Sequence, residues 1–217
     1  KALHIMGLMS DGGVHSHINH IIGLVDMAKK KGLTEVYVHA LMDGRDTPPE
    51  SGVNYLAEME KALADTGVGK LASVIGRYYG MDRDNNWDRI ELAYDALFSG
   101  TGETAVSSDE AIKSSYAAGV TDEFVKPTKV TEGGNSIGLI KDGDGVIFAN
   151  FRPDRARQLT RAIIEEDFKG FTRKVHPKVN FVCMAQYDAT FDVPVAYPPQ
   201  KIVNGFGEVV SKAGLKQ

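Results

Sequence analysis

The feature that most constrains this chain is a regular alternation of short apolar runs with longer amphipathic stretches. Apolar residues at every third or fourth position predict that the amphipathic stretches are helices, and the apolar runs have the length of strands. Strands that alternate with helices predict right-handed βαβ crossovers and a mainly parallel sheet. We therefore expect an α/β fold of three layers, with helices on both faces of the sheet. The expected strands are residues 3–9, 35–41, 70–76, 145–151 and 179–184.

Four helices are expected between these strands. The first carries Ile18 and Val25 on its apolar face, and Gly32 after it can adopt the left-handed conformation that ends a helix. The second follows Pro48 and Pro49, since proline is common in the first turn of a helix. The four apolar stripes span residues 18–28, 53–63, 87–97 and 156–163.

The stretch 101–144 breaks the alternation. It holds a helical pattern over 108–118 and two short β-type runs, 126–130 and 136–140, on either side of a Gly-Gly pair. Such a pair between two strand-like runs is typical of a hairpin turn. We expect a small hairpin and helical insertion within one domain, because no linker, repeat or low-complexity tract divides residues 1–217.

The composition excludes several classes of protein. Hydrophobic residues make up 42% and charged residues 25% of the chain, as in an ordinary soluble globular protein. The net charge of −4 argues against a nucleic-acid partner, since phosphate backbones recruit broad basic surfaces. No apolar run reaches membrane-spanning length, and no signal-peptide pattern opens the chain. The single cysteine, Cys183, cannot form a disulfide within the chain, so we expect a cytoplasmic protein without a membrane partner.

The two ends of the sequence indicate a fragment. Lys1 is followed almost at once by a strand-like run, without an initiator methionine, and the chain stops at Gln217 without a polar tail. We therefore expect a piece of a longer protein.

Arginines gather in the connections that follow the expected strands. Five of the nine arginines lie there, whereas the sixteen lysines are mostly elsewhere. Because an open α/β sheet binds ligands beyond the carboxyl ends of its strands, we expect these connections to meet at one edge. Arginine presents a planar fork of donors that fits carboxylate and phosphate, while lysine is a hydrated point charge. The five are Arg45, Arg77, Arg83, Arg152 and Arg155.

The connection after the first strand adds hydrogen-bond donors at the same edge. Gly12 and Gly13 allow the backbone to approach a ligand closely, and the helix that begins near Ser16 presents free N–H groups to an anion. A small ligand with a phosphate and a carboxylate, carrying about three negative charges, fits these donors. Each arginine alone could instead be a surface ion-pair partner, and Asp43 and Asp46 could be turn or cap residues.

His15 and His17 raise the possibility of a metal site, since two imidazoles two residues apart can share an ion on an extended segment. The pair lies where a loop is expected to enter a helix, so the two rings should diverge, and no clear cluster of further ligands accompanies them. A metal-dependent hydrolase that uses Asp11, His15 and His17 is a minor alternative.

Four long motifs resemble those of the cofactor-independent phosphoglycerate mutases. They occur in order over nearly the whole chain, which makes the signal far more specific than a lone glycine pattern. The motifs are Ser10-Asp-Gly-Gly-Val-His-Ser-His17, Leu41-Met-Asp-Gly-Arg-Asp46, Gly76-Arg-Tyr-Tyr-Gly-Met-Asp-Arg-Asp84 and Asn150-Phe-Arg-Pro-Asp-Arg155.

The resemblance implies an isomerase of glycolysis and gluconeogenesis that interconverts 3-phosphoglycerate and 2-phosphoglycerate through a phosphoserine. Family members have an alkaline-phosphatase-like domain with two metal ions, usually manganese, into which a second α/β domain that holds the glycerate is inserted. Residues 1–217 look like that inserted domain alone, and an insertion should bring Lys1 and Gln217 close together. The nucleophilic serine and the ligands of the two Mn²⁺ ions then lie in the absent phosphatase-like domain. This chain alone is expected to bind no metal and to be inactive.

By the same resemblance, seven residues are expected to contact the substrate. Asp46 is the candidate general acid or base for the glycerate hydroxyl, and His15 would hydrogen-bond the substrate. The arginines would anchor its phosphate and carboxylate. The seven are His15, Arg45, Asp46, Arg77, Arg83, Arg152 and Arg155. An autonomous module that binds phosphate and carboxylate ligands is the alternative from the class of binding proteins.

Overall fold

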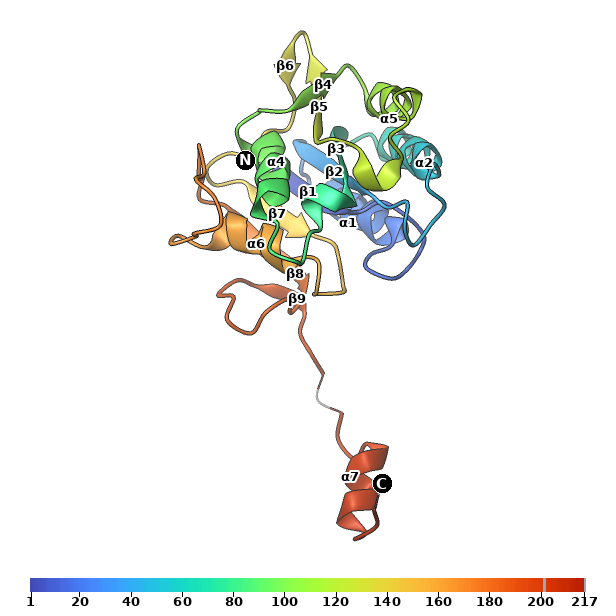
Figure 1. Ribbon diagram of the computed structural model, residues 1–217, viewed down its shortest axis with the longest axis vertical. Coiled ribbons are helices and arrows are strands. Elements are labelled where there is room, and N and C mark those ends of the chain that lie inside the picture. The colour runs from blue at the N-terminus through green and yellow to red at the C-terminus, as the bar shows by residue number, and fades with distance from the viewer. Residues whose placement is uncertain (201, 217) are drawn as a thin grey trace.

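A computed structural model describes residues 1–200 and 202–216 of the chain. Its centre is a nine-stranded sheet in the order β4-β5-β3-β2-β1-β7-β8-β9, with β6 paired to β5 (Figure 1). All neighbouring strands are parallel except β5, which runs antiparallel to β3 and to β6. The strands are β1 (Leu3–Leu8), β2 (Val36–Met42), β3 (Lys70–Gly76), β4 (Glu103–Ala105), β5 (Thr128–Glu132), β6 (Asn135–Ser136), β7 (Gly145–Phe148), β8 (Asn180–Ala185) and β9 (Val195–Tyr197).

Helices lie on both faces of this sheet, which confirms the expected α/β fold. The helix α1 begins after His17, whose Nδ1 accepts a hydrogen bond from the Asn19 amide at 3.2 Å, and α2 ends at Gly67 with a left-handed φ of 72°. The helices are α1 (Ile18–Lys30), α2 (Gly52–Thr66), α3 (Arg77–Gly80), α4 (Trp87–Phe98), α5 (Ser108–Ala117), the 3₁₀ turn η1 (Asp122–Phe124), α6 (Arg157–Ile164) and α7 (Phe206–Lys212).

Two hydrophobic cores form because successive side chains of a strand point to opposite faces. On one face, β1 residues such as Met6 pack with α4 and α6. On the other face, Ile5 and its neighbours pack with α1, α2 and α5, and Figure 1 shows these two groups of helices on opposite sides of the sheet. Each fully buried Leu, Ile or Met contributes about 1.5–3 kcal/mol of burial free energy. Continuous apolar runs such as residues 3–9 reflect burial on both faces.

The order of the strands reverses between β1 and β7. From β1 the chain proceeds through β2 to β3 in one direction, and from β7 it proceeds through β8 to β9 in the other. The connections that leave the carboxyl ends of β1 and β7 therefore diverge to opposite faces. A crevice at such a point is the usual ligand site of an open α/β sheet.

The stretch 101–144 contains the expected helix and hairpin, but it does not form a separate lobe. Its strand β5 pairs with β3, at Val74↔Thr128, and β4 pairs with β5, so the stretch extends the main sheet. The hairpin turn falls at Gly133 and Gly134, both with positive φ.

The helix α7 lies apart from the sheet in Figure 1, and none of its described residues is buried. The expectation that Lys1 lies near Gln217 concerns a residue outside those that the structure describes. None of the described helices is both long enough and apolar enough to cross a membrane.

Candidate anion-binding site

All seven side chains predicted from the sequence belong to four connections at the carboxyl edge of the sheet. One follows β1, and two each follow β2, β3 and β7. The connections of β1 and β7 lie side by side, since the amides of Phe151 and Arg152 both donate to the backbone oxygen of His15, at 2.8 and 3.3 Å. The seven are His15, Arg45, Asp46, Arg77, Arg83, Arg152 and Arg155.

The centre of the site is a buried ion-pair cluster around Arg77. Its side chain is 3% exposed, and Nη1 donates to Asp43 Oδ1 and to Asp46 Oδ2, each at 2.7 Å. The Ser10 hydroxyl donates to Asp43 Oδ2 at 2.6 Å, and the Asp46 amide donates to Asp43 Oδ1 at 2.9 Å. Burial alone would raise the pKa of Asp43, but these hydrogen bonds and the Arg77 charge hold it below its usual value. Arg77 is therefore fixed in place without a ligand.

His15 lies between two carboxylates. Its Nε2 is 3.9 Å from Asp46 Oδ2, and its Nδ1 is 3.7 Å from Asp154 Oδ1. The side chain is only 4% exposed, and within the described part of the chain Nδ1 has no hydrogen-bond partner. Burial and the charges of Arg77 and Arg152 lower the pKa of His15 to about 4, although Asp154 and Asp46 act in the opposite direction. The imidazole is therefore neutral at pH 7.

The remaining arginines form a more open rim. Arg45, whose side chain is 57% exposed, donates to Glu123 Oε1 at 3.1 Å. Arg83 and Arg152 share Asp154: Arg83 Nη1 donates to Oδ2 at 2.8 Å and Arg152 Nε to Oδ1 at 3.0 Å. Such exposed pairs are weak, about 0–1 kcal/mol, so an incoming anion can replace the carboxylates.

Arg155 completes the site without a carboxylate of its own. Its Nη1 donates to the backbone oxygen of Met81 at 3.1 Å. Burial, and then the charges of Arg77, Arg83 and Arg45, lower the pKa of Arg155, which places these guanidinium groups within electrostatic reach of one another. The five arginines therefore form one cluster.

The charges of the cluster nearly balance without a ligand. Five guanidinium groups face four carboxylates, those of Asp43, Asp46, Asp154 and Glu123. The last two belong to the open rim. An anionic ligand that binds the rim arginines would take the place of these two carboxylates as their hydrogen-bond partner.

The sequence did not single out three of these carboxylates as site residues. Asp43 precedes Gly-Arg and was equally consistent with a turn. Asp154 lies between two arginines in the sequence, which drew the interpretation to the arginines. Glu123 lies 78 residues from its partner Arg45. The position of Asp43 directly after a buried strand is the signal that could have identified it. Glu123 had no local signal.

Two glycines let the supporting segment at η1 approach the site loops. Gly44 has φ of 68°, and an added Cβ would lie 2.8 Å from Asp122 Cβ. At Gly76, which precedes Arg77, an added Cβ would lie 2.4 Å from the backbone oxygen of Glu123. Side chains at these positions would push η1 away from the loops after β2 and β3.

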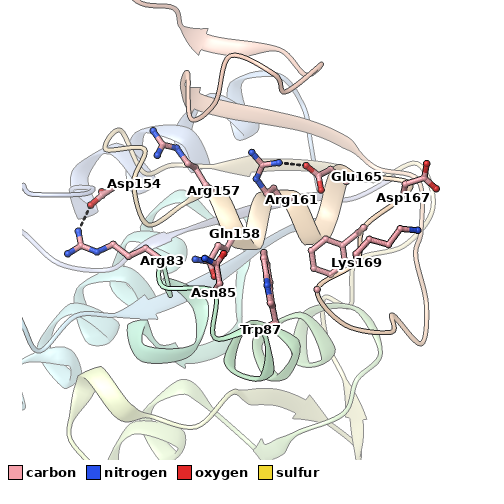
Figure 2. Close-up of a pocket in the computed structure, with 12 residues that line it drawn as sticks. Arg83, Asn85, Trp87, Asp154, Arg157, Gln158, Arg161, Glu165, Asp167 and Lys169 are labelled. Atoms are coloured by element: carbon pink, nitrogen blue, oxygen red, sulfur yellow. Dashed lines mark hydrogen bonds and ion pairs between the residues drawn. The ribbon is translucent and has the colours of Figure 1, made fainter.

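A cavity of about 520 Å³ adjoins the cluster. Figure 2 shows its walls, which include the Arg83–Asp154 ion pair at one end and Trp87 and Gln158 beneath α6. It is lined by two members of the cluster, Arg83 and Asp154, while His15 and Arg77 lie outside it. The rim that holds Asp154 therefore borders an open space.

The three residues of the alternative metal site have other partners. Asp11 accepts a hydrogen bond from the Tyr55 hydroxyl, and His17 caps α1. His15 lies between Asp46 and Asp154, with Nε2 3.9 Å from Asp46 Oδ2. Across the described residues, no group of three or more His, Cys, Asp or Glu side chains is arranged to hold a metal ion.

The family model described as BPG-independent PGAM N-terminus (iPGM_N) matches residues 1–189. The chain belongs to this family. Among curated relatives, the 2,3-bisphosphoglycerate-independent phosphoglycerate mutases of Clostridium perfringens (strain SM101 / Type A) and Moorella thermoacetica are 58% and 51% identical over the whole chain. The chain spans 42% of the length of each of these relatives.

A solved structure of a phosphoglycerate mutase is also similar to this chain. The crystal structure of Leishmania mexicana phosphoglycerate mutase at low cobalt concentration matches 99% of the chain with a TM-score of 0.88 and 36% sequence identity. The match covers 41% of the Leishmania chain. The curated relatives and the solved structure are thus all named phosphoglycerate mutases.

Proposed function

We propose that this chain is the substrate-binding domain of a cytoplasmic phosphoglycerate mutase that interconverts 3-phosphoglycerate and 2-phosphoglycerate in glycolysis and gluconeogenesis. The gathering of five arginines from the connections after β2, β3 and β7 at one edge of the sheet is the observation that carries this proposal. A phosphate ester has a charge of about −1.5 to −2 at pH 7, and a carboxylate adds one more. A ligand with these two anionic groups can bind the rim arginines in place of Asp154 and Glu123.

The role of each arginine then follows from how deeply its side chain is buried. Arg77 is buried and already oriented, so it positions the ligand at little cost in entropy. Arg45, Arg83 and Arg152 are partly exposed and exchange their carboxylate partners for the ligand. These charge-assisted hydrogen bonds hold the glycerate while its phosphate is away.

Asp46 is the group that we assign to proton transfer at the glycerate hydroxyls. One oxygen of its carboxylate is held by Arg77, and the side chain is 20% exposed, so it is both oriented and open to a ligand. Moving a phosphate between neighbouring hydroxyls requires one oxygen to gain a proton and the other to lose one. His15, 3.9 Å from Asp46 Oδ2, would hydrogen-bond the bound substrate.

The phosphate acceptor is assigned to a part of the protein outside this chain. We place it, as a serine with two Mn²⁺ ions, in an alkaline-phosphatase-like domain into which this chain is inserted. The 42% coverage of the relatives leaves room for such a domain, and the described residues hold no metal-binding group of their own. Closure of the two domains would exclude water that could hydrolyse the phosphoserine. The chain alone should therefore bind substrate without turning it over.

Calorimetric titration of the chain tests this assignment. We expect 3-phosphoglycerate to bind more tightly than glycerate or inorganic phosphate, since only the whole substrate offers both a phosphate and a carboxylate to the arginines. A coupled assay on the same sample should detect no 2-phosphoglycerate. Equal affinities for the three ligands, or turnover by the chain alone, would contradict the proposal.

A further inference from the structure

Asp154 stands where two arginines and a histidine converge. Its Oδ2 accepts from Arg83 at 2.8 Å, and its Oδ1 accepts from Arg152 at 3.0 Å. The same Oδ1 lies 3.7 Å from His15 Nδ1, just beyond hydrogen-bond length. A shift of under 1 Å would complete that bond. Figure 2 shows Asp154 turned toward Arg83 at the edge of the cavity.

This arrangement leaves Nδ1 of the His15 imidazole without a hydrogen-bond partner among the described residues. A buried polar nitrogen without a partner costs about 1–3 kcal/mol, and such atoms are rare in folded proteins. Two carboxylates flank the ring, yet both are engaged by arginines: Asp46 by Arg77, and Asp154 by Arg83 and Arg152. The carboxylates that could accept a hydrogen bond from the ring therefore lie beside it, but arginines already bind them.

The arginines that bind the two carboxylates determine which carboxylate can move. The amides of Phe151 and Arg152 bind the backbone oxygen of His15, so the two connections at the reversal of strand order are joined as one unit. Asp46 is held by the buried Arg77, whereas the described residues that hold Asp154 are side chains that are 45% and 48% exposed. Asp154 is the carboxylate that a ligand can release.

We propose that Asp154 is a positioning residue that exchanges partners when the anionic substrate binds. Without substrate it is the counter-ion of Arg83 and Arg152. When the phosphate and carboxylate of the substrate take these two arginines, Asp154 accepts a hydrogen bond from His15 Nδ1–H. This bond fixes the tautomer, so that Nε2 faces Asp46 and the substrate. The inference rests on the proposed function, because it requires an anion in the arginine cluster.

Binding should also change the proton affinity of His15. The charged groups that face its ring are Arg77, Arg152, Asp154 and Asp46. Burial and the two arginines lower the pKa of His15 to about 4 in the free chain. A bound anion neutralises the charges of the two arginines, while Asp154, released from its arginine partners, still faces the ring. Both changes favour the protonated imidazole, so the pKa of His15 rises. Binding of an anion to Arg83 and Arg152 thereby changes the pKa of His15, which lies beside Asp46.

The test is nuclear magnetic resonance of the 217-residue chain labelled with ¹⁵N in its histidine side chains. His15→Gln identifies the His15 signals among the six histidines. Saturation with 3-phosphoglycerate should raise the pKa of His15 by about one unit or more, with the proton of the neutral ring on Nδ1. In Asp154→Asn, the ligand should bind at least as tightly, because a competing carboxylate is gone, but the Nδ1–H signature should be lost and the pKa rise should shrink.

Two further variants distinguish a partner exchange from a structural role. In Arg83→Gln/Arg152→Gln, Asp154 is released without any ligand, so the free chain should already show a raised His15 pKa and the Nδ1–H tautomer. Asp188→Asn removes a carboxylate from another arginine, Arg161, and should leave His15 unchanged.

The outcomes separate the two proposals. Absence of 3-phosphoglycerate binding by the unmodified chain would overturn the proposed function and, with it, this inference. Binding that leaves His15 unaltered would overturn the partner exchange alone. So would an identical His15 response in Asp154→Asn, or a double variant whose free form keeps the low pKa.

Discussion

The sheet carries two polar clusters that differ in how completely their members satisfy one another. One is the arginine–carboxylate cluster at the carboxyl edge. The other is a buried chain of hydrogen bonds on the face covered by α4: Asp144 Oδ2 to His4 Nε2 at 3.3 Å, His4 Nδ1 to His39 Nε2 at 3.0 Å, and His39 Nδ1 to Ser73 Oγ at 2.9 Å.

The buried chain is closed, while the cluster is open. Both ring nitrogens of His4 and of His39 have partners within the protein, and the rings stack at 5.3 Å between centroids. In the cluster, His15 Nδ1 and Arg77 Nε lack partners among the described residues, and the rim arginines reach solvent. A closed network stabilises the fold and offers nothing to a ligand, whereas an open one is available for binding. Polar burial alone therefore does not identify a functional site.

Arg77→Ala should have the largest effect on stability, because Arg77 belongs to the open cluster and also neutralises a buried carboxylate. The change leaves the Asp43 carboxylate, whose side chain is 1% exposed, without its counter-ion. We expect a loss of about 3–5 kcal/mol in the free energy of unfolding. Urea denaturation at pH 7 measures it. Arg45→Ala, which removes an exposed arginine, should cost about 1 kcal/mol or less; equal losses would show that burial does not distinguish the two.

Acid should destabilise the protein through the closed chain. Burial lowers the pKa of His4 despite the opposing Asp144, and burial with the neighbouring His4 lowers the pKa of His39 further. The unfolded chain then binds more protons than the folded one as the pH falls below about 6.5, so stability decreases on acidification. The slope is about 1.4 kcal/mol per pH unit for each histidine.

Urea denaturation between pH 5 and pH 8 in ~0.1 M salt measures this slope. His39→Gln should flatten it while lowering stability at pH 8, since a hydrogen-bonded group is lost. His15 adds to the slope as well, and saturation with 3-phosphoglycerate should reduce the contribution of His15 without changing that of His4 and His39. An unchanged slope in His39→Gln would show that the closed chain does not carry the effect.

Arg152→Ala should separate binding from stability at the rim. Its side chain is 48% exposed and paired only with Asp154, so the free energy of unfolding should change by about 1 kcal/mol or less. Loss of a charge-assisted hydrogen bond to substrate should weaken 3-phosphoglycerate binding about 10²-fold. Calorimetry and urea denaturation of the same sample compare the two. Unchanged affinity would remove Arg152 from the site.

Tyr55→Phe should have a small effect on stability and none on the arginine cluster. The Tyr55 hydroxyl donates to Asp11 and ties the connection after β1 to α2, and burial with Asp11 raises the pKa of Tyr55 to about 12. Removal of one exposed hydrogen bond should cost about 0.5–1.5 kcal/mol in thermal denaturation. Tyr37→Phe, on β2, is the matched control. A larger loss than that of Arg77→Ala would reverse the ranking of the two regions.

Much of the scaffold was predictable because burial leaves a local periodic trace. The five central strands and the helices α1, α2, α4, α5 and α6 lie where apolar spacing placed them. The short strands β4 and β9 were missed, since three residues carry no detectable period. The sequence did not show that the insertion at 101–144 extends the main sheet, because pairing of β5 with β3 joins residues far apart in the chain.

The sequence by itself determined the order of strands and helices, the family motifs and the arginines that follow the strands, since each depends on residues close together in the chain. Only the tertiary structure decided which charges pair. Arg45 meets Glu123, Arg83 meets Asp154, and His4 joins His39 and Asp144 across three strands. The physical reason is that electrostatic and hydrogen-bond energies depend on distance through space, to which separation along the chain is no guide.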